Sequence, residues 1–187
     1  MAIETGFSSA TTIADAQRDM RMAYVSGAPG IFVSALAWLL AGCVAWSMSP
    51  QKAVIALFVG GMCIHPVSLL LVKLLGRSGK HGAGNPLGAL AMETTVWLIL
   101  CMPVTYAVSL YRVDWFFPAM LVMIGGRYCI FATLFGNRWY WACAAALIGA
   151  AWLLVSMRAS PTLAALSGSA IEAVFAVMIF AQARREQ

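Results

Sequence analysis

The chain has 187 residues, of which 62% are hydrophobic and 10% are charged, and its mean hydropathy is +0.84. An ordinary soluble domain is about 25% charged, so this chain lacks the polar residues needed to cover a surface that faces water, and the composition predicts a membrane protein. This excludes a soluble enzyme domain, a disordered regulator and a nucleic-acid binder, because the net charge of +5 is better explained by Lys and Arg residues that flank membrane spans.

Residues 1–28 are predicted to form a cytoplasmic N-terminal segment that contains a short amphipathic helix. Residues 1–10 carry no basic stretch before an apolar core, which predicts that no signal peptide is cleaved. Thr12 precedes Asp15 by three residues, as in a capping box. We expect the helix to lie on the membrane surface, either as an anchor for the first span or as a gating or partner-binding element. Its apolar residues recur at helical spacing: Ile13, Ala16, Met20 and Tyr24.

Residues 29–187 are predicted to form an all-α, polytopic bundle of six transmembrane helices. A spanning helix needs about 20 mainly apolar residues, and the chain supplies six such runs. The loops between them are too short to fold as separate domains, so a site must lie between helices or in the loop at 76–86. The predicted spans are 29–48, 53–75, 87–110, 116–135, 139–157 and 161–183.

Basic residues are distributed unequally between the two sides of these spans. Most flank the spans on the side of both termini, and Arg127 lies inside a span. The positive-inside rule therefore predicts that both termini are cytoplasmic. The basic residues on the side of the termini are Arg18, Arg21, Lys73, Arg77, Lys80, Arg138, Arg184 and Arg185; those on the other side are Lys52, Arg112 and Arg158.

Four ionisable residues fall inside different predicted spans: His65, Glu93, Arg127 and Glu172. A charged group in hydrocarbon is costly unless it is paired or hydrated, so each is a candidate site residue. At about 1.5 Å per residue, all four lie between the cytoplasmic third of the membrane and its midplane. We therefore expect them to converge on one polar pocket.

Arg127 cannot lose its proton and needs a carboxylate, water or a bound anion. We expect it to contact Glu93 rather than Glu172, because Glu93 lies nearer to the same depth. The pair is either a buried ion pair that fixes helix register or part of a centre in which the second glutamate exchanges protons. Because two acids and the His65 imidazole accompany one fixed cation, we favour a hydrated pocket over a dry core.

Two aromatic residues extend this group. Trp97 lies one turn after Glu93 and Tyr128 follows Arg127, and rings beside charges can wall a cavity for an organic cation or an amphipathic molecule. The predicted substrate-binding residues are thus His65, Glu93, Trp97, Arg127, Tyr128 and Glu172. Five other aromatic residues at span ends are assigned to interfacial belts: Tyr111, Trp115, Trp139, Tyr140 and Trp141.

Glycine and proline mark the surroundings of the ionisable residues. Gly60, Gly61 and Pro66 lower the helical propensity near His65. This segment is expected to form either a simple proline kink or a broken helix that lines a site. Pairs of small residues precede three of the ionisable residues, which predicts either three related hairpins around a polar centre or close packing of ordinary helices. These pairs are Gly60-Gly61, Gly125-Gly126 and Gly168-Ser169.

The loop at 76–86 is rich in glycine and contains Arg77 and Lys80. Successive backbone N–H groups in such a loop can bind an anion. The loop is predicted to be a flexible linker, with binding of a lipid headgroup as the functional alternative.

Templates for enzymes and cofactors fit the chain poorly. The cysteines lie within apolar runs and form no C-x-x-C pair, which predicts small buried side chains rather than disulfides or a zinc site. His65 is the only histidine inside a span, which excludes a haem with two histidine ligands. We predict no metal, no cofactor and no catalytic residue, although acid–base chemistry by His65 and Glu93 stays open. The cysteines are Cys43, Cys63, Cys101, Cys129 and Cys143.

Two resemblances follow from short motifs. Gly-Ala-Pro-Gly before the first span, Gly-Gly-Met-Cys-Ile-His-Pro in the second, the glycine-rich loop, and Phe-Phe-Pro with Gly-Gly-Arg-Tyr in the fourth resemble a bacterial family of small multi-span proteins without assigned function. This resemblance implies the bacterial inner membrane. Six spans, cytoplasmic ends and alanine at positions 37, 41 and 45 are similar to substrate-binding subunits of energy-coupling-factor vitamin transporters.

Taken together, these features predict a membrane transport protein, or one that binds a solute or proton at an intramembrane polar site. The alternatives are a membrane-embedded enzyme that acts on a lipid-soluble substrate and a non-catalytic assembly subunit. The expected partners are membrane lipids, a small-molecule or proton ligand and further copies of the chain, with no nucleic acid.

Overall fold

The computed structural model describes residues 12–185, over which the chain forms six helices long and apolar enough to cross a membrane. The prediction about a signal peptide concerns residues outside this range. A short helix, α1, precedes the long ones, and one-turn segments η1 (Val25–Gly27) and η2 (Val113–Trp115) lead into α2 and α5. The helices are α1 (Ile13–Tyr24), α2 (Ala28–Ser47), α3 (Pro50–Leu74), α4 (Leu87–Tyr111), α5 (Phe116–Phe135), α6 (Trp139–Ser156) and α7 (Pro161–Arg185).

The six predicted spans are confirmed as helices, with ends within a few residues of the expected positions. Proline occupies the first turn of α2 and α3 and opens α7, where its missing N–H costs no helical hydrogen bond. Gly136 ends α5 in the left-handed conformation, with φ of 59°, which glycine adopts without strain. Turn-forming residues at the ends of apolar runs therefore set the helix boundaries.

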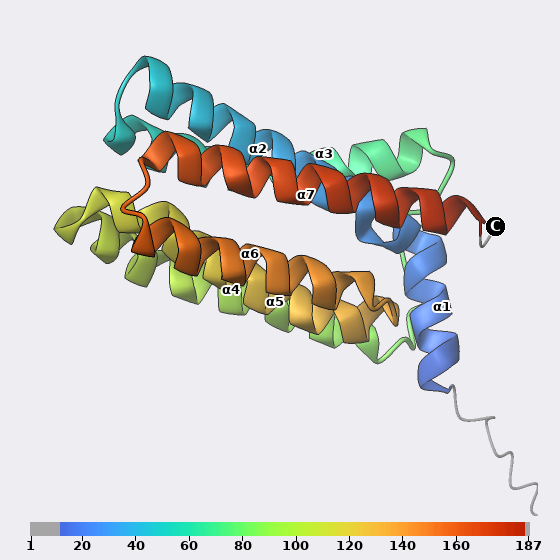
Figure 1. The fold of residues 1–187 in the computed structure, drawn as a ribbon. Helices are drawn as coiled ribbons and strands as arrows, with labels where there is room; N and C mark the ends of the chain where they lie inside the picture. The colour runs from blue at the N-terminus through green and yellow to red at the C-terminus, as the bar shows by residue number, and fades with distance from the viewer. Residues whose placement is uncertain (1–11, 186–187) are drawn as a thin grey trace, which may run out of the picture.

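The long helices form two layers, with α2, α3 and α7 in one and α4, α5 and α6 in the other (Figure 1). Helix α2 packs extensively against both α3 and α7, and α5 packs against α6 and α4, while α6 and α7 join the layers. The order around the bundle is thus α3–α2–α7–α6–α5–α4. Contact between α3 and α4, the two ends of this order, is sparse, and only 11% of the most apolar 18-residue window of each is buried.

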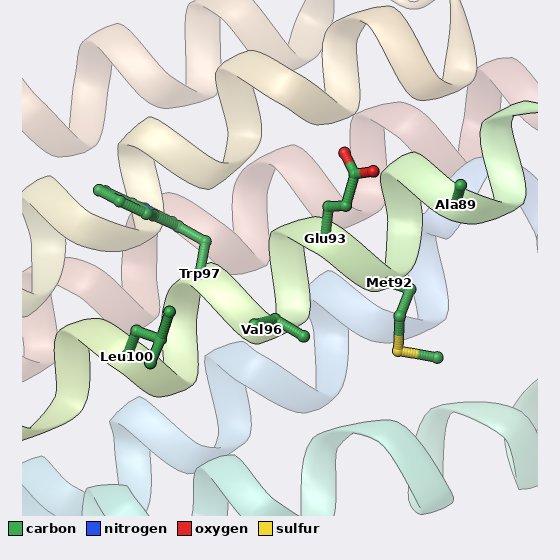
Figure 2. A pocket seen from close by; sticks show the side chains of 6 residues that line it. All are labelled: Ala89, Met92, Glu93, Val96, Trp97 and Leu100. Atoms are coloured by element: carbon green, nitrogen blue, oxygen red, sulfur yellow. The ribbon is translucent and has the colours of Figure 1, made fainter.

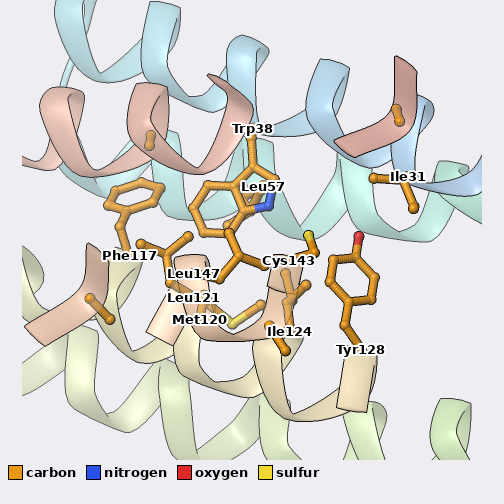
Figure 3. Packing of buried hydrophobic residues seen from close by; sticks show 14 of the residues in the cluster. Ile31, Trp38, Leu57, Phe117, Met120, Leu121, Ile124, Tyr128, Cys143 and Leu147 are labelled. Carbon is orange, nitrogen blue, oxygen red and sulfur yellow. The ribbon is translucent and has the colours of Figure 1, made fainter. Parts of the chain in front are cut away.

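Large side chains fill the space between the layers (Figure 3). Trp38 is fully buried and contacts Phe117, with ring centroids 6.1 Å apart. A Cβ atom on Gly168 would lie 2.9 Å from both Trp38 and Leu121, so only glycine lets α7 approach these side chains. Close helix packing therefore accounts for this small residue. Close packing was one of the two interpretations given above for the pairs of small residues.

Helix α1 crosses the end of the bundle at which the chain enters α2 and leaves α7 (Figure 1). The predicted capping box between Thr12 and Asp15 is present. Ala16 and Met20 are buried against the rest of the chain, whereas Ile13 is 69% exposed, so the apolar residues of α1 do not all pack on the bundle. The expected position of α1 on the membrane surface stays a prediction.

The loop at 75–86 is fastened to α1. The Asp19 carboxylate accepts hydrogen bonds from the Gly82 N–H at 2.8 Å and from the Asn85 side-chain amide at 2.7 Å. The Tyr24 hydroxyl and His81 Nδ1 lie 3.0 Å apart. The flexible linker expected from the glycine content is therefore a loop with fixed contacts.

Candidate functional site

The structure separates the six predicted site residues into two groups. Arg127, Tyr128 and Glu172 lie together where α5 and α7 face each other inside the bundle, whereas His65, Glu93 and Trp97 are exposed on α3 and α4. The expected convergence of four ionisable residues on one pocket is therefore not found. The candidate site is built around Glu172.

Glu172 is a carboxyl group with 0% exposure in the middle of α7. Its Oε1 accepts a hydrogen bond of 2.8 Å from the Tyr128 hydroxyl. Ser34 on α2 is close enough to interact, yet no hydrogen bond of acceptable geometry reaches Oε2 from any residue within 12–185. A buried carboxyl oxygen without a partner is costly, so this position suits a group that binds a proton, a water molecule or a ligand.

Tyr140 forms the wall of this site on the side of α1. Its hydroxyl donates a hydrogen bond of 2.7 Å to the carbonyl of Ser26, and its ring contacts those of Tyr128, Phe131 and Phe135, with centroids 5.6 to 5.7 Å apart. The assignment of Tyr140 to an interfacial belt is therefore wrong, because its ring is fully buried. Its position at a span end gave no sign of this.

Cys143 interacts with Glu172, and Trp38 lies farther along the same space between the layers. The Cys143 side chain on α6 is fully buried and interacts with Glu172. The ring nitrogen of Trp38 is buried and has no hydrogen-bond partner among the described residues. Figure 3 shows this nitrogen, the Cys143 sulfur and the Tyr128 hydroxyl in succession along the space between the layers. The prediction of buried cysteines holds for Cys101 and Cys143 but is wrong for Cys43 and Cys63, which are exposed.

The Arg127 guanidinium lies beside this group, with neutral partners. Its Nη2 donates to the Thr95 hydroxyl at 3.2 Å, its Cζ lies 5.0 Å from the centre of the Phe131 ring, and its Nε has no hydrogen-bond partner in the described chain. No carboxylate within residues 12–185 comes within the 4.0 Å of an ion pair with Arg127. Of the two candidate acids, Glu172 interacts with it electrostatically at longer range.

The expected contact between Arg127 and Glu93 is therefore wrong, and the reason is helical phase. Thr95 faces Arg127, and residues two positions apart on a helix point in nearly opposite directions, because each residue advances by about 100°. Glu93 consequently lies on the other side of α4. An estimate of depth along a span says nothing about the direction in which a side chain points.

Glu93 and Trp97 line a shallow groove of about 440 Å³ on the outer surface of α4 (Figure 2). Trp97 is 54% exposed, and the other lining residues are apolar. We expected a hydrated pocket between the helices. This groove is not that pocket, because it lies on the outside of the bundle, on the side of α4 opposite Thr95. The lining residues are Ala89, Met92, Glu93, Val96, Trp97 and Leu100.

His65 is exposed on α3, which runs unbroken through Pro66. Phe58, two turns earlier and therefore on nearly the same face, contacts Tyr106 of α4 and Phe116 of α5. His65 thus lies on the side of α3 that is turned toward α4 and α5, and α3 and α4 are only sparsely in contact. The unbroken helix supports a proline within a continuous span rather than a broken helix.

Comparison with known proteins identifies a family without a described activity. The model of a family of unknown function, DUF7010, matches residues 13–182. No curated protein and no solved structure matches the chain.

Proposed function

Since this chain belongs to the DUF7010 family, whose function is unknown, we propose that it is a membrane transport protein that binds a proton at Glu172. The observation that carries the proposal is the fully buried carboxyl group with one oxygen held by Tyr128 and the other unpartnered. A purely structural carboxyl group is expected to have both oxygens satisfied. An intramembrane acid with a free oxygen is typical of proton relays.

The charge balance supports a group whose charge changes. Arg127 stays positive, and Glu172 is the acid that interacts with it. With Glu172 ionised, the two charges offset each other across Tyr128. With Glu172 protonated, Arg127 becomes the uncompensated charge of this layer. The two states of Glu172 therefore differ in the field that a ligand near Arg127 experiences.

The proposed setting is the bacterial inner membrane, with both termini in the cytoplasm. The start of α1, the end of α7 and the loop at 75–86 lie at the same end of the bundle, and most of the basic residues named above flank that end. The positive-inside rule supports a cytoplasmic position for it.

A non-catalytic assembly subunit is the second candidate, because the faces of α3 and α4 are so little covered by the rest of the chain. An acid–base enzyme is disfavoured. His65 faces α4 across the sparse boundary and Glu93 lies on the far side of α4, so the two residues do not form a catalytic pair.

The test is an infrared titration of the purified protein in lipid nanodiscs. We expect a protonated-carboxyl band that changes with pH, disappears in Glu172→Gln and persists in Glu93→Gln, the matched control on the exposed face of α4. In proteoliposomes under an imposed pH gradient, wild type and Glu93→Gln should carry protons, and Glu172→Gln should not.

A single charge state of Glu172 throughout the pH range of the folded protein would contradict the proposal. The same holds if Glu172→Gln and wild type carry protons equally well. In either case the assembly subunit becomes the better explanation.

A further inference from the structure

We propose that Arg127 binds the carboxylate of an organic anion that enters from the bilayer between α3 and α4, and that the anion binds together with the proton of Glu172. This inference rests on the proposed function and adds the chemical class of the ligand and its route. It starts from the position of Arg127.

Arg127 has donors to spare and no acid beside it. One nitrogen is bound by the neutral Thr95 hydroxyl, one face of the guanidinium lies on Phe131, and Nε is unpartnered in the described chain. A guanidinium fork matches the two oxygens of a carboxylate and forms short, charge-assisted hydrogen bonds with them. An incoming carboxylate would satisfy Nε and replace the missing counter-ion.

Three helices carry polar side chains at a similar distance from the α1 end of the bundle, and one of these, Thr95, contacts the guanidinium. Arg127 lies 8 residues before the end of α5, Thr95 8 residues after the start of α4, and His65 9 residues before the end of α3. At about 1.5 Å per residue, all three are about 12 to 14 Å from the α1 end of the bundle. His65 is exposed and adds a second group that can donate to an anion.

The route follows from the packing order. Helices α3 and α4 end the order α3–α2–α7–α6–α5–α4, are only sparsely in contact and are the least buried of the long helices, and Thr95, which contacts Arg127, belongs to α4. The surrounding apolar residues suit a hydrocarbon tail, and a ligand that arrives from lipid does not have to pass through the packed core around Trp38.

Protonation of Glu172 couples to the anion through charge. Glu172 interacts with Arg127 and Tyr128 from α5, with Cys143 from α6 and with Ser34 from α2. Arg127 contacts Thr95 of α4 and interacts with Tyr140 of α6, while Glu93 lies on the side of α4 opposite Thr95. Of these groups only Glu172 supplies a negative charge to Arg127. Once it takes up a proton, the carboxylate replaces that charge, so one proton and one anion bind with no net change in charge.

The experiment measures binding by calorimetry in nanodiscs, corrected against empty nanodiscs, with proton uptake followed by a pH-sensitive dye. The probes are dodecanoate, acetate and, as the charge-reversed control, dodecyltrimethylammonium. We expect dodecanoate to bind wild type and Glu93→Gln with uptake of one proton per anion. Arg127→Lys should bind more weakly, Arg127→Gln should lose binding, and the cation should not bind.

Other outcomes overturn defined parts of the proposal. Equal binding of acetate places the source of the anion in water and overturns entry from the bilayer. Loss of binding in Glu93→Gln, or binding of the cation, moves the ligand site to the α4 groove. If no anion binds although the infrared band of Glu172 titrates, this inference fails and the proposed function stands. If anions bind without proton uptake and the band does not titrate, the proposed function fails.

Discussion

The Tyr140 hydroxyl is bound to the main chain at the bend between α1 and α2. The acceptor of this hydrogen bond is the carbonyl of Ser26. Both Ser26 and the preceding residue, Val25, have positive φ angles, of 53° and 52°. Non-glycine residues in this conformation are strained, so the surrounding structure must hold them. The buried hydrogen bond from Tyr140 is one contact that does so.

Tyr140→Phe should therefore lower the free energy of unfolding by about 1 to 2 kcal/mol, because the Ser26 carbonyl loses its buried donor. The matched control is Tyr111→Phe, since Tyr111 is 86% exposed and its replacement should leave stability unchanged. Thermal unfolding of the two variants in the same detergent is the measurement. Equal stability of both would contradict the role given to this hydrogen bond.

Adjacent glycines on α5 provide a second matched pair. A Cβ atom on Gly125 would lie 2.8 Å from Ile148 and 3.2 Å from the Ala144 carbonyl of α6, whereas one on Gly126 would meet nothing within 4 Å. Gly125→Ala should cost about 1 to 3 kcal/mol through overpacking. Gly126→Ala should be neutral or stabilise by up to about 1 kcal/mol. Equal unfolding temperatures would show that α5 and α6 are packed less closely than described.

At this scale the sequence identified Arg127, Tyr128 and Glu172 but not their partners. Intramembrane charge is rare enough to single out the ionisable residues. Which neighbour each one meets depends on the rotation of its helix, and helices that are apolar on all sides carry no periodic signal for that rotation. Thr95 was missed for this reason, since it resembles any other threonine in a span.

At the scale of elements, α1 shows how one helix can hold distant parts of the chain. Its Asp19 carboxylate is bound by Asn85 and by the Gly82 N–H, and these hydrogen bonds lower the pKa of Asp19 below its usual value of 3.8. A carboxylate whose pKa is lowered by folding stabilises the folded state above its unfolded pKa. This contribution is lost as the pH falls through the lower, folded pKa.

The fastening of the loop to α1 should accordingly loosen at acidic pH, below about pH 4. A spin label at Ser78, on a background in which the native cysteines are replaced, should gain mobility as the pH falls through this range. In Asp19→Asn the label should be more mobile at neutral pH and should respond less to acid. A label that responds equally in both backgrounds would assign the effect to another group.

The helix ends were predictable because proline and glycine stand at the ends of apolar runs. The fixed loop was not, because its contacts join residues far apart in the chain, such as Asp19 and Asn85, which are 66 positions apart. Glycine content indicates what a backbone can adopt, and only the partner decides whether it stays mobile.

For the whole molecule, the least predictable property is the order of the helices around the bundle. Six runs of similar hydropathy specify six spans without specifying neighbours. The first and last spans, α2 and α7, form the most extensive pair, and the Ser169 hydroxyl donates to the Ala35 carbonyl across it at 2.9 Å. Small residues on α7 permit this approach.

The order can be tested by cross-linking on the cysteine-free background. Phe58 and Tyr106 have ring centroids 6.2 Å apart, so cysteines at these positions should be joined by a short bifunctional reagent. Val104 lies on nearly the opposite side of α4 from Tyr106, and a cysteine there should not be joined to one at Phe58. Efficient linkage of both pairs, or of neither, would contradict the contact between α3 and α4 through Phe58 and Tyr106.

The attachment of α1 has a consequence for biosynthesis. Gln17 and Arg21 donate to the carbonyls of Thr133 and Phe135, residues 116 and 114 positions later in the chain. During translation α1 leaves the ribosome before the six long helices, yet these carbonyls are synthesised only with the end of the fourth span. At about 5 to 20 residues per second, α1 waits for many seconds before it can dock. It therefore reaches its native position only once α5 has been made, and until then it is open to chaperones and to proteases.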